Sequence, residues 1–140
     1  MAISDEEMLA GLPDIRIDHD NKEYYRGLLE HRLLINRCVQ CSTWHFPPRA
    51  SCPKCWSWDI APTEVSGKGT IHHFSFRNDL PAHGAPKEPY PVVAVNLDEG
   101  VRFTSTLIGC AKSNLKIGMR VELAWIENGA PFPAFRPVSQ

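Results

Sequence analysis

Cys38-Val39-Gln40-Cys41 and Cys52-Pro53-Lys54-Cys55 form two C-x-x-C pairs that are separated by ten residues. Two such pairs let four thiolates converge tetrahedrally on one divalent ion, and zinc is the usual occupant. The spacing is a little shorter than in most zinc ribbons, but the chain can still leave one knuckle as a strand and return to the other. We therefore predict a closed, structural zinc site that leaves no coordination position open for chemistry.

Three alternatives to this zinc site were weighed: disulfides, a redox pair and a histidine ligand. Disulfides are disfavoured because residues 1–7 lack the basic region and the apolar run of a secretory signal. A redox role would explain one C-x-x-C pair, whereas two pairs at ribbon spacing fit one structural site better. His45 lies between the pairs and could replace a cysteine, although four cysteines are already available.

Length, composition and charge narrow the class of protein. The 140 residues suffice for one ordinary domain, or for a small domain with an extension. A hydrophobic content of 43% supports a core, and no apolar run approaches the length that spans a bilayer. The net charge of −1 disfavours a nucleic-acid binder, which normally carries a clustered basic surface. A soluble, cytoplasmic protein is expected.

Two helices are expected in an N-terminal segment, residues 1–32. Ser4-Asp5-Glu6-Glu7 and Asp20-Asn21-Lys22-Glu23 both have the pattern of a capping box. An apolar stripe follows the second pattern, and it indicates an amphipathic helix. The stripe consists of Tyr24, Tyr25, Leu28 and Leu29. It packs either on the protein's own domain or on a partner protein, and the sequence leaves both possibilities open.

The rest of the chain is expected to be mainly β, with a zinc ribbon over residues 33–62 and a barrel over residues 63–140. Strands should lead into and out of the first knuckle. Beyond the ribbon, five segments with alternating or β-branched residues predict strands at 70–76, 92–97, 101–107, 121–126 and 135–138. A five-stranded Greek-key barrel of the OB type accounts for them. Gly67 and Gly69 suggest the bend or bulge that a small closed barrel needs.

Seven short motifs between about residue 20 and the end of the chain carry a family resemblance. They are Tyr24-Tyr25-Arg26-Gly27-Leu28, Arg37-Cys38-x-x-Cys41, Phe46-Pro47-Pro48-Arg49, Cys52-Pro53-x-Cys55, Val65-Ser66-Gly67-Lys68-Gly69-Thr70, Ile117-Gly118-Met119-x-Val121 and Phe135-Arg136-Pro137. With them the chain resembles the zinc-ribbon/OB-fold proteins that were long catalogued as a domain of unknown function and that occur beside thiolases. The family usually has Phe-Trp where this chain has Tyr24-Tyr25. The resemblance implies a rubredoxin-like, structural ribbon.

The resemblance also implies a function. It points to a non-catalytic accessory subunit of a thiolase-superfamily enzyme complex, whether an acyl-CoA thiolase, an acyltransferase or a retro-aldolase. In such complexes the catalytic cysteine or tyrosine belongs to the thiolase-like partner. The zinc-ribbon/OB subunit bridges subunits and helps to enclose the CoA or acyl channel. A hetero-oligomer with structural zinc is therefore expected, with a coenzyme A ester as substrate of the whole complex.

No catalytic residue is predicted in this chain. Cys110 lies outside the ribbon, and no local motif supplies it with a base. Residues 77–91 form a long, proline-rich connection between two barrel strands, and long loops in compact domains often bind ligands. Cationic and aromatic groups in this connection suit the phosphate and adenine of CoA. These candidate contacts are Arg77, His83, Lys87 and Tyr90. A merely solvated loop is the alternative.

Two other functions compete with the accessory subunit. An OB-fold nucleic-acid-binding protein with a zinc ribbon would bind single strands through aromatic side chains and a basic groove. The acidic balance and the scarcity of Lys and Arg on the barrel strands, where Arg102 is nearly alone, disfavour it. A stand-alone CoA-binding carrier or regulator is the third possibility. Co-purification of a thiolase-like protein, of nucleic acid or of CoA alone would separate the three.

Overall fold

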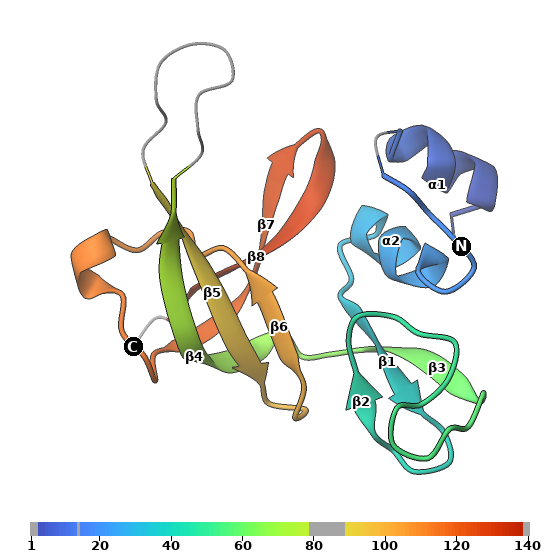
Figure 1. Ribbon diagram of the computed structural model, residues 1–140. Helices are drawn as coiled ribbons and strands as arrows, with labels where there is room; N and C mark the ends of the chain where they lie inside the picture. Colours follow the sequence, from blue (N-terminus) through green and yellow to red (C-terminus); the bar gives the residue numbers. More distant parts are fainter. Residues whose placement is uncertain (1–2, 14, 79–88, 139–140) are drawn as a thin grey trace.

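The computed structural model describes residues 3–13, 15–78 and 89–138, and it contains two sheets and two short α-helices. The helices are α1 (Asp5–Gly11) and α2 (Lys22–Leu29), and the first sheet holds β1 (Leu34–Cys38), β2 (Trp44–His45) and β3 (Ile60–Glu64). The second sheet holds β4 (Lys68–Arg77), β5 (Tyr90–Leu97), β6 (Arg102–Ser105), β7 (Arg120–Asn128) and β8 (Ala130–Pro137). In Figure 1 the helices and the small sheet lie on one side, and the curled larger sheet lies on the other. The mainly β fold is thus confirmed.

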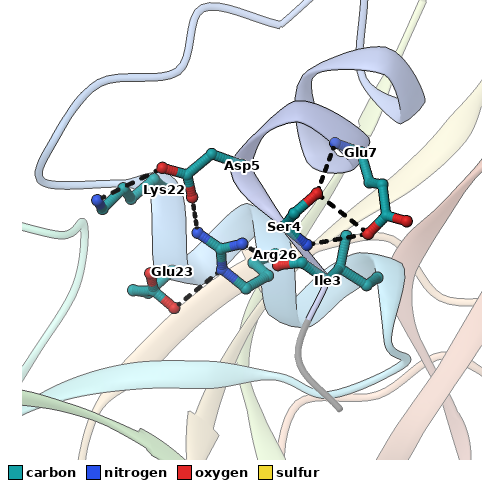
Figure 2. A network of polar contacts seen from close by, with 7 residues as sticks. All are labelled: Ile3, Ser4, Asp5, Glu7, Lys22, Glu23 and Arg26. Atoms are coloured by element: carbon teal, nitrogen blue, oxygen red, sulfur yellow. Dashed lines mark hydrogen bonds and ion pairs between the residues drawn. The ribbon is translucent and has the colours of Figure 1, made fainter.

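Polar contacts fasten α1 to α2. The capping box predicted at Ser4 is present, with Ser4 and Glu7 exchanging side-chain and backbone hydrogen bonds. Figure 2 shows Arg26, which is only 8% exposed, between Asp5 and Glu23, with a further bond to the backbone carbonyl of Ile3. An arginine placed there is satisfied by groups from both helices, so the first helix is held at a defined angle to the second.

The second capping box does not form. Asn21 occupies the N-cap of α2 but makes no capping bond from its side chain. The Asp18 side chain instead accepts the backbone N–H groups of Asp20 and Asn21 at 2.9 Å. An Asx-type turn two residues earlier therefore satisfies these donors, because a short carboxylate competes well for nearby backbone N–H groups.

The apolar stripe of α2 packs on the protein itself. Leu28 is buried in the core cluster, and Tyr24 and Tyr25 are partly buried against it. The ring centroid of Tyr24 lies 5.3 Å from that of Phe46, which follows β2. Our alternative, that the stripe is a free surface for a partner, is wrong for Tyr24 and Leu28, because the N-terminal helix has the ribbon and the barrel to cover.

The small sheet has the strand order β2-β1-β3, and all its pairs are antiparallel. The strands predicted around the first knuckle are confirmed within one residue. The sequence did not predict β3, because Pro62 lies at its centre and we placed the boundary between the ribbon and the barrel there. Pro62 is tolerated because β3 is an edge strand, where a missing N–H donor costs no ladder bond on the open side.

The large sheet has the order β6-β5-β4-β7-β8 and curls into an OB-like half-barrel. A parallel bridge between Leu107 and Phe135 joins the segment after β6 to β8, with the Ile108 N–H donating to the Phe135 carbonyl at 2.8 Å. The two ends of the sheet thereby meet. The five predicted strands are confirmed, although β8 begins at Ala130 and is twice as long as expected.

The prolines of β8 explain that underestimate. Phe135 donates its N–H to the Thr106 carbonyl, so this N–H points away from β7. Every second residue of a strand directs its N–H to the same side, and three prolines lie an even number of residues from Phe135. They are Pro131, Pro133 and Pro137, which pair with Glu127, Trp125 and Val121. Their missing donors therefore fall on the side away from β7, and the β7–β8 ladder stays intact.

The bulge in β4 lies at a different place from the expected one. The pairing of β4 with β5 shifts between Ile71 and His73, so His72 is the extra residue, and both His72 and His73 are exposed. Adjacent residues of a regular strand face opposite sides, and the bulge removes that alternation here. Gly67 and Gly69 instead permit close approach: a Cβ on Gly69 would lie 2.6 Å from the Asn96 carbonyl oxygen.

One hydrophobic core runs through the ribbon and the half-barrel. It includes Leu28 of α2, Ile35 of β1, Val95 of β5 and Phe135 of β8, all buried. The ring centroids of Phe46 and Phe103 lie 5.0 Å apart, and this contact links the end of β2 to β6. The ribbon is therefore braced by the barrel and does not depend on its metal site alone for its position.

Candidate metal centre

The four ribbon cysteines converge on one point. Their Sγ atoms all lie within 4.8 Å of one another. The Cys38 and Cys55 sulfurs are 3.5 Å apart, and the Cys41 and Cys52 sulfurs are 3.6 Å apart. A tetrahedron of thiolates about 2.3 Å from a zinc ion has sulfur–sulfur distances of roughly 3.8 Å. The donor set and its spacing therefore fit zinc, and they are far too wide for disulfides.

The two knuckles have the same backbone geometry. In the first, the Ser42 N–H donates to the Cys38 carbonyl at 2.9 Å; in the second, the Trp56 N–H donates to the Cys52 carbonyl at 3.0 Å. Ser42 and Trp56 each follow the second cysteine of a pair, and both have positive φ angles, 62° and 67°. This turn points both thiols of a pair to the same side, and it forces a left-handed residue directly after it.

Hydrogen bonds reach two of the sulfurs, and at Cys41 they favour the thiolate form. The hydroxyl of Thr43, with its Oγ1 3.1 Å from the Cys41 sulfur, and the backbone of Thr43 lower the pKa of Cys41 to about 6. The backbone N–H groups of Lys54 and Cys55 donate to the Cys52 sulfur at 3.4 and 3.5 Å. A thiolate that is already favoured at Cys41 helps metal binding, because a cysteine ligand must be deprotonated.

His45 does not join the cysteine cluster. The cluster of potential ligands among the described residues contains only the four cysteines, and His45 is buried at 6% exposure. Neither ring nitrogen has a hydrogen-bond partner among the described residues. Burial lowers the pKa of His45, and the nearby Arg49 backbone offsets this only in part. His45 is therefore a neutral packing residue of β2.

The fifth cysteine lies apart from the metal cluster. Cys110 is half-buried beside the core, and its sulfur lies 3.4 Å from the Ala111 carbonyl oxygen. Among the described residues, it belongs to no group of potential metal ligands. The geometry gives no sign of an activated nucleophile at this position.

The candidate CoA contacts are only partly described. Arg77 at the end of β4 and Tyr90 at the start of β5 are paired directly across the two strands. They flank the base of the long connection, with Arg77 exposed and Tyr90 half-buried. His83 and Lys87 lie outside the described residues.

Two tryptophans beside the second knuckle stand out on the surface. Trp56 is 76% exposed and Trp58 is 78% exposed. A third tryptophan of the ribbon, Trp44, is instead half-buried under the Arg37 guanidinium, which lies 5.0 Å from the centroid of its ring. Sequence reasoning missed Trp58, although a second tryptophan two residues after the first in a metal knuckle was a visible signal.

Family models match both parts of the chain. One is described as “ChsH2, rubredoxin-like zinc ribbon domain” and matches residues 26–59; the other is described as “ChsH2, C-terminal OB-fold domain” and matches residues 62–126. Among solved structures, a chain of an “Ltp2-ChsH2(DUF35) aldolase” is similar, with a TM-score of 0.78 and 36% identity over 88% of this chain and 98% of that chain. A DUF35 protein from Sulfolobus solfataricus shares the fold at a TM-score of 0.63, 12% identity and 95% coverage, 96% of that chain.

Sequence relatives include both short and long proteins. A “DUF35 domain-containing scaffold protein” from Methanocaldococcus jannaschii is 34% identical over 70% of this chain and 71% of its own length. A “Probable enoyl-CoA hydratase alpha subunit” from Thermomonospora curvata is 36% identical over 89% of this chain. The chain spans only 40% of that longer protein. The protein belongs to the ChsH2/DUF35 family of zinc-ribbon and OB-fold proteins, and the resemblance found in the sequence is confirmed.

Membrane-spanning helices are not found in the part of the chain that the structure describes, because neither α-helix is long and apolar enough.

Proposed function

We propose that this chain is an accessory subunit of a thiolase-superfamily enzyme complex that acts on CoA esters, and that it carries one structural zinc. The observation that supports this most is the similarity to the ChsH2(DUF35) chain of the Ltp2-ChsH2 aldolase, which this protein matches over 98% of that chain's length. The likeness therefore covers nearly the whole of that chain, at 36% identity.

Names of the longer relatives support a CoA ester as the substrate of the complex. The Thermomonospora curvata relative carries the name “Probable enoyl-CoA hydratase alpha subunit”. A relative from Mycobacterium tuberculosis is named “3-oxo-4,17-pregnadiene-20-carboxyl-CoA hydratase alpha subunit”. It is 33% identical to this chain over 77% of the chain, and the match covers 34% of the relative's own length. We propose a CoA ester with a bulky, apolar acyl group, handled by a retro-aldolase, thiolase or acyltransferase partner that supplies the catalytic residues.

Zinc would be held by Cys38, Cys41, Cys52 and Cys55. With four thiolates bound, no coordination position remains for substrate, so the ion would supply structure and no chemistry. Its task would be to fix the second knuckle, which carries Trp56 and Trp58.

These two tryptophans would contact the partner. Large aromatic side chains are enriched among the residues that dominate binding energy, and they are uncommon on free surfaces at such exposure. Trp56 is also held at a φ of 67°, a conformation that a bulky residue rarely adopts. Backbone strain that is kept at an exposed aromatic residue is typical of a functional position.

The connection between β4 and β5 would lie near the substrate. Arg77 and Tyr90 bracket its base, and with His83 and Lys87 it would offer cations for the CoA phosphates and a ring for the adenine. This assignment rests on the residue types and the length of the connection.

Co-expression tests the proposed function. The chain is produced together with each thiolase-superfamily subunit of its source organism, and complexes are isolated by size-exclusion chromatography. We expect one such subunit to elute with this chain at a fixed ratio and to cleave or transfer its CoA ester. The isolated chain should show no turnover.

Two results would contradict this proposal. Robust aldolytic, thiolytic or acyl-transfer activity of the pure chain, abolished by Cys110→Ala, would make the chain an enzyme in its own right. Tight co-purification of single-stranded nucleic acid, with no thiolase-like partner, would favour the OB-fold binder instead.

A further inference from the structure

An apolar pocket of about 470 Å³ lies between the N-terminal segment and the β7–β8 hairpin. Leu12 and Ile15 form one wall, Tyr24 and Tyr25 of α2 form the floor with Leu28, and the start of β8 forms the opposite wall. Residues far apart in sequence therefore build it together. Small-molecule sites in proteins typically have volumes of roughly 300–1,000 Å³.

The wall that the N-terminal segment provides is firmly held. Leu12 is 4% exposed and Met8 is 2% exposed, so both are packed on the protein. Arg26 ties α1 to α2 through Asp5 and Ile3, as Figure 2 shows. The pocket is thus a formed feature of the fold.

The lining has a uniform chemistry. Among the described residues that line the pocket, none is Lys, Arg, His, Asp or Glu. The polar side-chain groups of these described residues are the phenol hydroxyls of Tyr24 and Tyr25, both half-buried. Burial strongly raises the pKa of Tyr24, so its hydroxyl keeps its proton and can donate. At the rim, Phe132 and Ile15 are 52% and 38% exposed.

We propose that this pocket binds a neutral, largely apolar molecule or acyl group that carries a carbonyl or hydroxyl oxygen, with Tyr24 or Tyr25 as hydrogen-bond donor. An uncharged, apolar lining favours an aliphatic or alicyclic body, because a charged ligand would lose its hydration without a partner. The two phenol hydroxyls add a preference for an oxygen acceptor. This inference stands on the pocket alone and does not depend on the proposed enzyme complex.

Two sources could supply such a ligand, a free lipid-like molecule and the acyl part of a CoA ester. Fluorescence titration of the full-length chain with the neutral probe 1-aminoanthracene measures binding, and competitors then displace the probe. Octan-2-one should compete three- to tenfold more tightly than octane, in line with one hydrogen bond. Octanoyl-CoA competing at least as well as octan-2-one would identify the acyl group as the source; weaker competition would identify a free ligand.

Ala130→Phe places a ring in the pocket from the start of β8, and it should abolish saturable binding of the probe. Ala111→Phe is the matched control, because Ala111 is exposed in a loop outside the pocket. Zinc content and thermal unfolding report whether each variant is folded. If Ala130→Phe binds the probe as tightly as the wild type, the probe sits elsewhere and the proposal is overturned.

Tyr24→Phe and Tyr25→Phe keep the aromatic floor and remove one hydroxyl each. At least one of them should erase the preference for octan-2-one over octane and leave octane binding unchanged. Thr104→Val, which removes an exposed hydroxyl on β6 outside the pocket, should keep the preference. An unchanged preference in the Tyr24→Phe, Tyr25→Phe double variant, or a wild type without saturable probe binding, would reject the site.

Discussion

Ser42 and Trp56 have the same backbone conformation but very different side chains. Each follows the second cysteine of a knuckle, with φ angles of 62° and 67°. Glycine adopts this left-handed region without strain, whereas other residues pay about 1–2 kcal/mol there. A serine is a small departure from that preference. A tryptophan is a large one, and so a functional reason is needed for Trp56.

Trp56→Gly should therefore raise stability and weaken assembly at the same time. We expect the free energy of unfolding to rise by about 0.5–1 kcal/mol from relieved backbone strain, because the exposed indole contributes little packing. The dissociation constant for the thiolase-like partner should rise at least tenfold, as for a lost aromatic anchor. Denaturant titration and surface plasmon resonance measure the two effects.

Ser42→Gly is the matched control for this change. It relieves backbone strain at the equivalent position of the other knuckle and removes no aromatic anchor. Its stability should rise by a smaller amount than that of Trp56→Gly, while partner binding stays unchanged. Equal loss of binding in both variants would mean that the knuckle backbone, and not the indole, governs assembly.

A second prediction at the scale of single residues concerns the metal ligands. Cys38→Ser should abolish zinc binding and unfold the ribbon, because structural zinc contributes on the order of 10 kcal/mol of apparent free energy. Cys110→Ser, which changes the cysteine outside the cluster, should keep one zinc per chain and the wild-type melting temperature. Elemental analysis and circular dichroism test both. Well-folded wild-type protein without zinc or iron would contradict the metal site.

At the scale of secondary-structure elements, close backbone approach at β4 is what shapes the half-barrel. Gly67 precedes β4 at a φ of 79°, and its carbonyl accepts the Leu123 N–H at 2.8 Å. A Cβ at Gly67 would lie 2.5 Å from the Leu123 Cβ. The turn and the contact with β7 therefore both require glycine.

Gly67→Ala should lower the free energy of unfolding by about 3 kcal/mol, from left-handed strain and from the clash together. Gly109→Ala is the control, since Gly109 has a φ of 69° and open space around its Cβ position. It should cost only about 1 kcal/mol, the backbone part alone. Urea titration compares the two, and equal losses would show that the contact with Leu123 relaxes freely.

At the scale of the whole molecule, the ribbon, the helices and the half-barrel share one core. Ile35 of the ribbon and Val95 of the barrel are both fully buried in it. Trp56 and Trp58, the Arg77–Tyr90 pair and the apolar pocket are therefore carried on one body. In the assembly that we propose, the zinc-supported contacts and the base of the β4–β5 connection would be positioned together.

Deletion of residues 81–87 tests the proposed task of the β4–β5 connection. Arg77 and Tyr90 pair at its base, and five residues (78–80, 88 and 89) remain between them, which suffice for a hairpin. The deletion should thus leave assembly unchanged but raise the KM of the complex for its CoA ester severalfold. A Gly/Ser segment of equal length is the control for loop length. Unchanged kinetic constants would make the connection a solvated loop.

The sequence by itself determined the local chemistry of this protein. Two C-x-x-C pairs specify a four-thiolate cluster whatever the rest of the fold, because each knuckle needs only its own turn. Alternating residues likewise placed the barrel strands, since period-two patterns are read locally. The family motifs then supplied the order of the parts and the expected partner.

Only the tertiary structure decided which surfaces remain free. The sequence leaves Tyr24 open as a contact for a partner protein, whereas in the fold Phe46, from a distant part of the chain, packs against it. The prolines of β8 disfavour a strand in the sequence, whereas in the fold the positions that lack an N–H lie on the side away from β7. The apolar pocket is likewise invisible locally, because its lining comes from α2, from residues 12–15 and from the β7–β8 hairpin. Burial, strand parity and cavity walls depend on contacts between distant segments, and a pattern within one segment does not contain them.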